Sequence, residues 1–132
     1  MVGMILVLIC MSLMLQGCVL LVLGAGAGAG AATVAYVKGE LKTTYAASLN
    51  RTWDATLSAL KDLQMDVHTR KKDATEGNIE ATKADGTKVK ITLEPAGPDT
   101  TSVRIRVGTF GDEEVSRVIN RKIASKLGVK SQ

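Results

Sequence analysis

Side chains able to perform catalysis are sparse in this chain of 132 residues. His68 is the only imidazole, and a nucleophile needs a base together with a third group that orients it. The alternation around His68 places it on the polar side of a predicted strand, where we expect a surface contact with Glu80. We therefore predict that the protein is not an enzyme and that it uses no cofactor.

Three consecutive carboxylates, Asp112-Glu113-Glu114, have the chemistry to hold a cation. They open a predicted helix, and acids in a first helical turn stabilise the helix dipole and its free N–H groups. The basic residues toward the other end of that helix follow the same rule. Two cysteines and one histidine exclude zinc-finger and iron–sulfur designs. We predict no metal site and no nucleic-acid partner.

Cys18 has the most specific chemistry in the chain. Residues 4–15 form an apolar segment as long as the core of a signal peptide, and Leu15-Gln16-Gly17-Cys18 follows it, a pattern typical of a bacterial lipobox. The small Gly17 fits the peptidase cleft. The thiol then takes a diacylglycerol, and the freed amine takes a third acyl chain such as palmitate. Each buried methylene contributes about 0.8 kcal/mol, so we predict a cleaved signal peptide over 1–17 and lipidation of Cys18.

An uncleaved transmembrane helix is the alternative. The apolar run continues past Cys18, so residues 1–23 are long enough to span a bilayer, and the first four residues lack the positive charge of a signal peptide. Gly24 and Gly28 then have the spacing of packed membrane helices, and this segment would drive self-association. Because no charge precedes Lys38, the body would stay in the cytoplasm.

The lipoprotein hypothesis places the body on the other side of the membrane from the transmembrane alternative. The residue after Cys18 is Val19 rather than Asp, which favours sorting to the outer membrane with the body facing the periplasm. Residues 18–38 then form a Gly/Ala-rich tether, about 25 Å long on average if it behaves as a flexible coil. The partner implied by Cys18 is the membrane itself, through the acyl chains.

Composition separates this first segment from the rest of the chain. Hydrophobic residues make up 45% of the sequence, and all the charges, which sum to +4, lie from Lys38 onward. The body, residues 39–132, therefore has an ordinary charged composition and the length of one small domain. These features exclude a long disordered chain and a multi-pass transporter.

Two helices and a run of strands account for the body. Trp53, Leu57, Leu60 and Leu63 share one face of a helix that Ser48 or Asn50 caps. A second helix begins near Asp112 and ends at Gly128. Alternating residues predict the strands. We expect an α+β fold: an antiparallel sheet of four to five strands with two helices packed on one face, in the order β-α-β-β-β-β-α, after an N-terminal hydrophobic signal or anchor segment.

Two hairpins fix the predicted registers. A three-residue loop, Ala84-Asp85-Gly86, pairs Ala81 with Val89 and keeps apolar residues on one face. A connection through residues 95–99 then places Ile91 opposite Val103 and Val89 opposite Ile105. The same register brings Lys88 opposite Arg106 and Lys90 opposite Arg104 on the face away from the helices.

These four cations are the candidate binding residues. Like charges directly opposite each other destabilise a sheet, so Lys88, Lys90, Arg104 and Arg106 either splay apart in solvent or meet an anionic partner. Lipid head groups, an envelope polysaccharide and an acidic protein surface all fit this patch.

The chain also resembles a family of small uncharacterised bacterial lipoproteins that is classed as a domain of unknown function. The similar stretches are Gly24–Ala32, Tyr36-Val37-Lys38-Gly39-Glu40-Leu41, Arg51-Thr52-Trp53-Asp54-Ala55-Thr56-Leu57, Leu60-Lys61-Asp62-Leu63, Ala84-Asp85-Gly86-Thr87 and Arg106-Val107-Gly108-Thr109-Phe110-Gly111-Asp112. They cover most of the mature chain. The resemblance implies a place in the cell envelope and brings no catalytic residue. The expected function is a membrane-anchored, non-catalytic binding or scaffold module.

Overall fold

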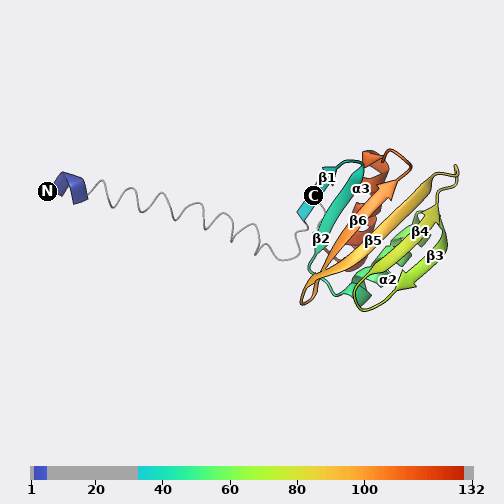
Figure 1. Ribbon diagram of the computed structural model, residues 1–132, viewed down its shortest axis with the longest axis horizontal. Helices are drawn as coiled ribbons and strands as arrows, with labels where there is room; N and C mark the ends of the chain where they lie inside the picture. Colours follow the sequence, from blue (N-terminus) through green and yellow to red (C-terminus); the bar gives the residue numbers. More distant parts are fainter. Residues whose placement is uncertain (1, 6–32, 130–132) are drawn as a thin grey trace.

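A computed structural model describes residues 2–5 and 33–129 of the chain, and residues 2–5 are helical. Residues 33–129 contain six strands and two helices (Figure 1), and from here on the body means the chain from Thr33 onward. In chain order these are β1 Thr33–Val37, β2 Glu40–Tyr45, α2 Leu49–Asp62, β3 Asp66–Lys72, β4 Gly77–Thr82, β5 Lys88–Gly97, β6 Thr100–Val107 and α3 Glu113–Leu127. The predicted α+β class and the order of elements after Gly39 are confirmed.

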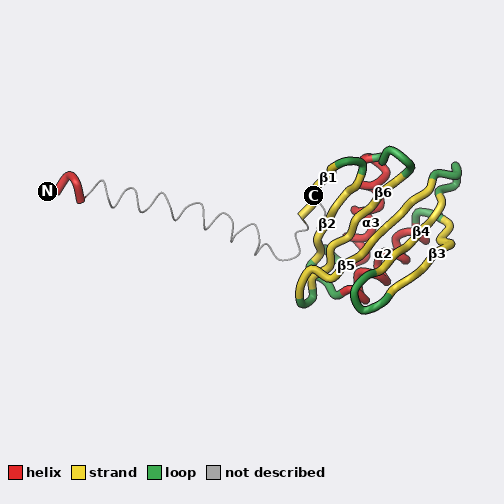
Figure 2. The backbone as a smooth tube through the Cα atoms, in the orientation of Figure 1, coloured by secondary structure: helices red, strands yellow, loops and turns green. Residues whose placement is uncertain are grey.

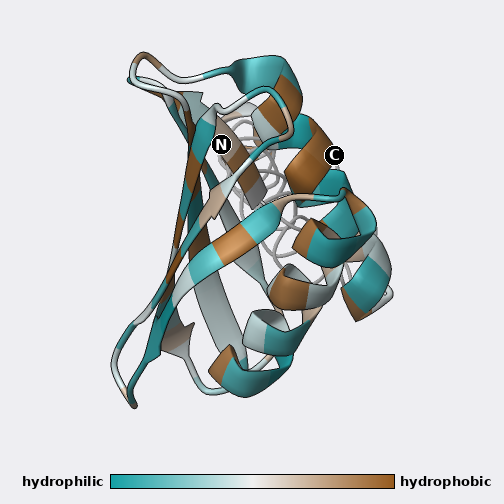
Figure 3. Cartoon of the chain, turned by 90° about the vertical axis from the view of Figure 1, so that its right-hand side faces the viewer, coloured by the Kyte–Doolittle hydropathy of each residue, from teal (hydrophilic) through white to brown (hydrophobic). Residues whose placement is uncertain are grey.

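All six strands form one antiparallel sheet in the order β1-β2-β6-β5-β4-β3. Figure 2 shows this single layer of strands with the helices behind it, and Figure 3 shows the sheet from the side, with α2 and α3 together on one face. We call the other side of the sheet the open face. The predicted two-layer arrangement is therefore confirmed.

The strand count is one higher than the upper end of the prediction. Thr33–Val37, which the sequence analysis assigns to the tether, forms β1 and pairs with β2. The turn between them consists of Lys38 (φ 53°) and Gly39 (φ 82°). Positive φ at both central residues defines a type I′ turn, whose twist matches that of the flanking strands. The sheet thus begins before the first charged residue.

The core lies between the sheet and the helices. Its fully buried aliphatic side chains come from the alternate residues of β2, β4, β5 and β6 and from both helices; they include Leu41, Ile79, Ile91, Leu93, Ile105, Leu60, Ile119 and Ile123. Trp53 on α2 is 8% exposed, and its ring lies over Gly77, where an added Cβ would come within 2.8 Å of Cζ3. Gly77 pairs with Leu93, so Trp53 covers that end of β5.

The predicted caps at the start of both helices and at the end of α3 are confirmed. The Ser48 hydroxyl accepts from the Arg51 N–H at 3.3 Å, and the Asp112 carboxylate accepts from the Val115 N–H at 3.1 Å. Gly128 closes α3 in a left-handed conformation. Arg51 also donates to the Leu127 carbonyl oxygen at 2.9 Å, which ties the start of α2 to the end of α3.

The β4–β5 hairpin has the predicted register. Ala81 pairs with Val89 and Ile79 with Ile91. Lys83 and Thr87 flank the loop, whose last residue, Gly86, has φ 89°. A three-residue loop with a left-handed third residue is therefore confirmed.

The predicted β5–β6 register is wrong by two residues. Ile91 pairs with Ile105 and Val89 with Val107, so Lys90 lies opposite Arg106 and Thr92 opposite Arg104. The strands continue beyond the predicted loop, with Pro95 opposite Thr101 and an irregularity before Gly97. Pro95 is tolerated because β4 ends at the Gly77–Leu93 pair, so β5 has no neighbour on that side at residue 95.

A second irregularity changes β3. Val67 pairs with Ala81 but Thr69 pairs with Glu80, so His68 is the extra residue of a bulge. Beyond the bulge the alternation is reversed, and Arg70 lies opposite the buried Ile79. The bulge keeps His68 on the open face, where its Nε2 forms a hydrogen bond with the Thr82 hydroxyl.

Candidate binding groove on the open face

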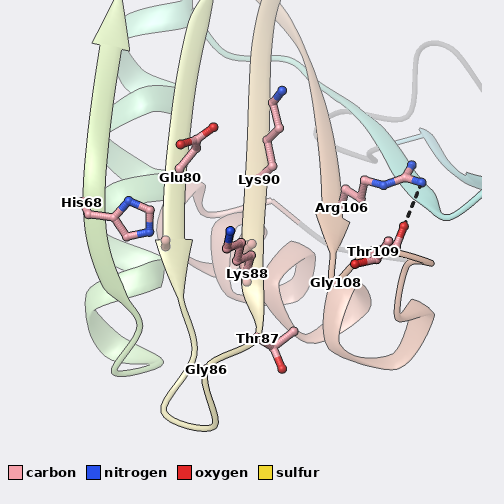
Figure 4. A pocket seen from close by; sticks show the side chains of 11 residues that line it. His68, Glu80, Gly86, Thr87, Lys88, Lys90, Arg106, Gly108 and Thr109 are labelled. Atoms are coloured by element: carbon pink, nitrogen blue, oxygen red, sulfur yellow. Dashed lines mark hydrogen bonds between the residues drawn. The ribbon is translucent and has the colours of Figure 1, made fainter.

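The open face carries the polar alternates of the same strands that build the core. A groove of about 640 Å³ runs across β3, β4, β5 and β6 near the β4–β5 hairpin. Its lining includes His68, Glu80, Lys88, Lys90, Arg106 and the hydroxyl residues Thr87 and Thr109. Figure 4 shows His68, Glu80, Lys88 and Lys90 on three neighbouring strands, with the guanidinium of Arg106 turned toward Thr109. We call this the open-face groove.

Two lysines supply unbalanced charge in the groove. Lys88 and Lys90 are exposed, and within residues 33–129 neither ammonium group lies within ion-pair distance of a carboxylate. Glu80 lies opposite Lys90 and Thr82 opposite Lys88, as the sequence predicts. One carboxylate therefore faces two lysines on these strands.

Arg106 is oriented by the backbone around it. Its guanidinium donates to the carbonyl oxygens of Lys38 at 3.4 Å and Thr109 at 3.3 Å, and lies 3.8 Å from the Glu40 carboxylate. These long contacts hold the group at the groove wall and leave its side chain 38% exposed. A planar guanidinium in this position can donate hydrogen bonds to an oxyanion that enters from the groove side.

The corrected register moves Arg104 from the position opposite Lys90 to the position opposite Thr92. It donates to the Glu94 carboxylate at 2.7 Å, so its charge is already matched. It lines an adjoining hollow of about 420 Å³ that Lys90 and Arg106 also line, together with the carboxylates of Glu40 and Glu76. The structure thus brings Lys88, Lys90 and Arg106 together in the groove and leaves Arg104 outside it.

His68 reaches the groove through the β3 bulge. Its Nε2 lies 3.0 Å from the Thr82 hydroxyl, and Glu80 lines the same groove. The sequence predicts His68 near Glu80 on the surface, and the two residues do line one groove; the bulge places Thr69 directly opposite Glu80. His68 adds a hydrogen-bonding group at the β3 side.

The β4–β5 loop forms one end of the groove. The Asp85 carboxylate accepts from the Thr87 N–H at 3.0 Å, and this hydrogen bond, together with nearby Lys83, holds the pKa of Asp85 below its usual range. Sequence reasoning missed Thr87 and Thr109 as lining residues. For Thr109 the available signal was its place just after β6, a strand that carries Arg104 and Arg106 on the open face.

One polar pair is buried on the helix side instead. The Tyr45 hydroxyl donates to the Asn120 side-chain oxygen, and burial raises the pKa of this phenol well above its ordinary value. This pair joins β2 to α3 inside the core, away from the groove. Its role is to hold the helix on the sheet.

The remaining predicted features are not brought into the groove. Cys18 and the Gly/Ala run lie outside the described residues. The described ranges, 2–5 and 33–129, include no helix with both the length and the apolar character needed to cross a bilayer. The same ranges contain no group of three or more His, Cys, Asp or Glu side chains placed to hold a metal ion. Asp112 acts as the α3 N-cap, as the dipole argument predicts.

Comparison with known proteins gives one informative result. No curated protein matches the sequence. A family model described as "Protein of unknown function (DUF3568)" matches residues 2–126, nearly the whole chain. The resemblance to a domain of unknown function is therefore confirmed, and the chain belongs to the DUF3568 family.

Proposed function

We propose that this protein is a membrane-anchored lipoprotein of the bacterial cell envelope whose body is a non-catalytic module that binds an anionic partner. The open-face groove carries the binding part of this proposal. It gathers Lys88, Lys90 and Arg106 on a rigid sheet and leaves both lysines without a carboxylate partner among the described residues.

The sequence before the body supports the anchor. The lipobox-like Leu15-Gln16-Gly17-Cys18 follows an apolar segment, and residues 19–32 separate Cys18 from β1. Even fully extended, such a segment reaches at most about 50 Å. A lipidated Cys18 would therefore keep Thr33, where the sheet begins, within that distance of a membrane surface. Val19 favours an outer-membrane, periplasm-facing location.

Charge explains how the groove would bind. Each Lys or Arg near an anionic membrane surface contributes about 1 kcal/mol, and neighbouring cations on a fixed sheet act together. Such binding weakens in salt, because the Debye length falls from about 10 Å at 0.1 M to about 3 Å at 1 M. Hydroxyl and imidazole groups in the same groove add hydrogen bonds to an oxyanion.

Metabolic labelling tests the anchor. Cells that express the full chain are grown with a fatty-acid analogue, and the parent is compared with Cys18→Ala. We expect label on the parent alone and an intact mass that lacks residues 1–17. Unmodified Met1 in the membrane fraction would instead support the uncleaved transmembrane helix.

Vesicle co-sedimentation tests the groove. Residues 33–132 contain every buried residue of the described part of the chain. This fragment is mixed with phosphatidylglycerol vesicles or neutral vesicles. Lys88→Ser/Lys90→Ser should weaken binding to anionic vesicles at least tenfold. The matched control, Lys61→Ser/Arg121→Ser, removes the same charge from the helices and should bind like the parent. Equal losses in both variants, or no effect of salt, would contradict a specific groove.

A further inference from the structure

The two edges of the sheet are protected very differently. At the β3 edge, the bulge at His68 interrupts the ladder, and Arg70, Lys71 and Lys72 follow it. Bulges and charged residues are the usual means by which proteins prevent a sheet edge from pairing with another chain. The β3 edge is therefore closed to strand addition.

The β1 edge has none of these protections. Its sequence, Thr-Val-Ala-Tyr-Val over Thr33–Val37, contains no charge, glycine or proline, and it pairs with β2 without a bulge. Val37 is 62% exposed. Within the described residues no strand lies on the outer side of β1. An uncharged, unbulged edge strand with free backbone groups is a template for another strand.

The β1–β2 turn determines which backbone groups face outward. Because the loop has two residues, Val37 and Glu40 form a hydrogen-bonded pair, and the alternation makes Ala35 and Lys42 another. The N–H and C=O groups of Val34 and Tyr36 therefore point away from β2. These four groups are free for a partner strand.

We propose that β1 pairs with β1 of a second copy of this chain, antiparallel and centred on Ala35. In this register Val34 of each copy exchanges both backbone hydrogen bonds with Tyr36 of the other copy. The two Ala35 residues then form the non-hydrogen-bonded pair on the open-face side, with Cα atoms about 4.5 Å apart. The two sheets become one continuous sheet of both copies.

A second copy that pairs through its own β1 fits this edge better than one that pairs through its β3. The strand carries no charge, so pairing with itself creates no like-charge contact across the ladder. Antiparallel self-pairing has two-fold symmetry and closes as a dimer. Pairing of β1 with a β3 edge would meet the bulge and would leave free edges at both ends. The proposal requires neither the lipid anchor nor an anionic ligand.

Disulfide trapping in whole cells tests this pairing on the full chain. Ala35→Cys places two thiols across a non-hydrogen-bonded pair, within the Cα separation of 4.4–6.8 Å that a disulfide needs. Cells are treated with diamide as the oxidant, and dimer is measured by non-reducing electrophoresis. Lys71→Cys, on the opposite edge, is the matched control, and the parent sets the background from Cys10 and Cys18.

We expect a dimer from Ala35→Cys at least fivefold above the Lys71→Cys variant and the parent. Adding Val34→Pro removes an outward N–H and should reduce the dimer to background, while trypsin resistance of the body reports that the fold persists. A monomeric Ala35→Cys variant with a trypsin-resistant body would overturn the proposal. Equal trapping at both edges, or trapping unaffected by Val34→Pro in a trypsin-resistant body, would also overturn it.

Discussion

The two faces of this sheet are built from alternate residues of the same strands, yet they follow different physics. On the helix-covered face, Ile91 and Ile105 pair at full burial. One residue along, Lys90 and Arg106 lie opposite each other on the open face, with Lys90 exposed and Arg106 half-buried. Burial of apolar surface stabilises the fold, whereas exposed charges contribute little to stability and leave their electrostatic field free for a partner. Stability and binding should therefore respond to separate sets of substitutions.

The largest effect is expected from Trp53 on the covered face. Trp53→Ala should lower the free energy of unfolding of residues 33–132 by about 3–5 kcal/mol, because the ring that covers Gly77 is lost and leaves a cavity. Urea denaturation followed by far-UV circular dichroism measures this, and Trp53→Phe should lose less. An unchanged midpoint in Trp53→Ala would mean that the covered face is assigned incorrectly.

The buried polar pair should come second. Tyr45→Phe leaves the Asn120 amide oxygen buried without the hydroxyl that pairs with it, at a cost of about 1–3 kcal/mol. Restoring an apolar pair with Tyr45→Phe/Asn120→Leu should recover part of that loss in the same denaturation experiment. Additive losses in the double variant would contradict a direct coupling of these two residues.

A smaller effect is expected from the matched charges of the open face. Glu94→Gln removes the carboxylate that pairs with Arg104 at 2.7 Å. Since both side chains are well exposed, the loss should be about 0.2–1 kcal/mol and should shrink in 1 M salt. Thermal melts at two salt concentrations check this. A loss comparable to that of Trp53→Ala would show that the open face helps to stabilise the core.

The smallest stability effect belongs to the groove lysines. Lys88→Ser/Lys90→Ser should change the free energy of unfolding by no more than about 0.5 kcal/mol, because neither lysine has an ion-pair partner among the described residues. The same variant should lose most binding to anionic vesicles. If it instead unfolded readily, its binding defect would have to be attributed to loss of structure.

The sequence predicts the faces of the strands well because a strand alternates with a period of two. A slip of one residue would bury Lys90 and expose Ile91, so the pattern excludes it. A slip of two residues keeps every side chain on its face, so the pattern cannot detect it. This is why the β4–β5 register, fixed by a three-residue loop, is correct and the β5–β6 register is not.

The candidate site was predicted only in part for the same reason. Lys88, Lys90 and Arg106 share the open face under either register, but their neighbours differ. The pairing of Arg104 with Glu94 follows from the two-residue shift. The hydrogen bond of His68 to Thr82 follows from a bulge that no local pattern in β3 indicates. The β5–β6 register and the β3 bulge therefore decided which side chains meet on the open face.

β1 also determines how the body would respond to mechanical tension. The chain enters the fold at Thr33, and β1 pairs only with β2 in the described part of the sheet. The fully buried core begins one strand later, at Leu41. A pull applied to the chain upstream of Thr33 therefore loads β1 first, through its five backbone pairs with β2 and the packing of Val34 and Tyr36 against the core. Separation of β1 from β2 would lengthen the tether by about 17 Å. β1 would therefore yield to tension first, while β2 and the helices stay folded.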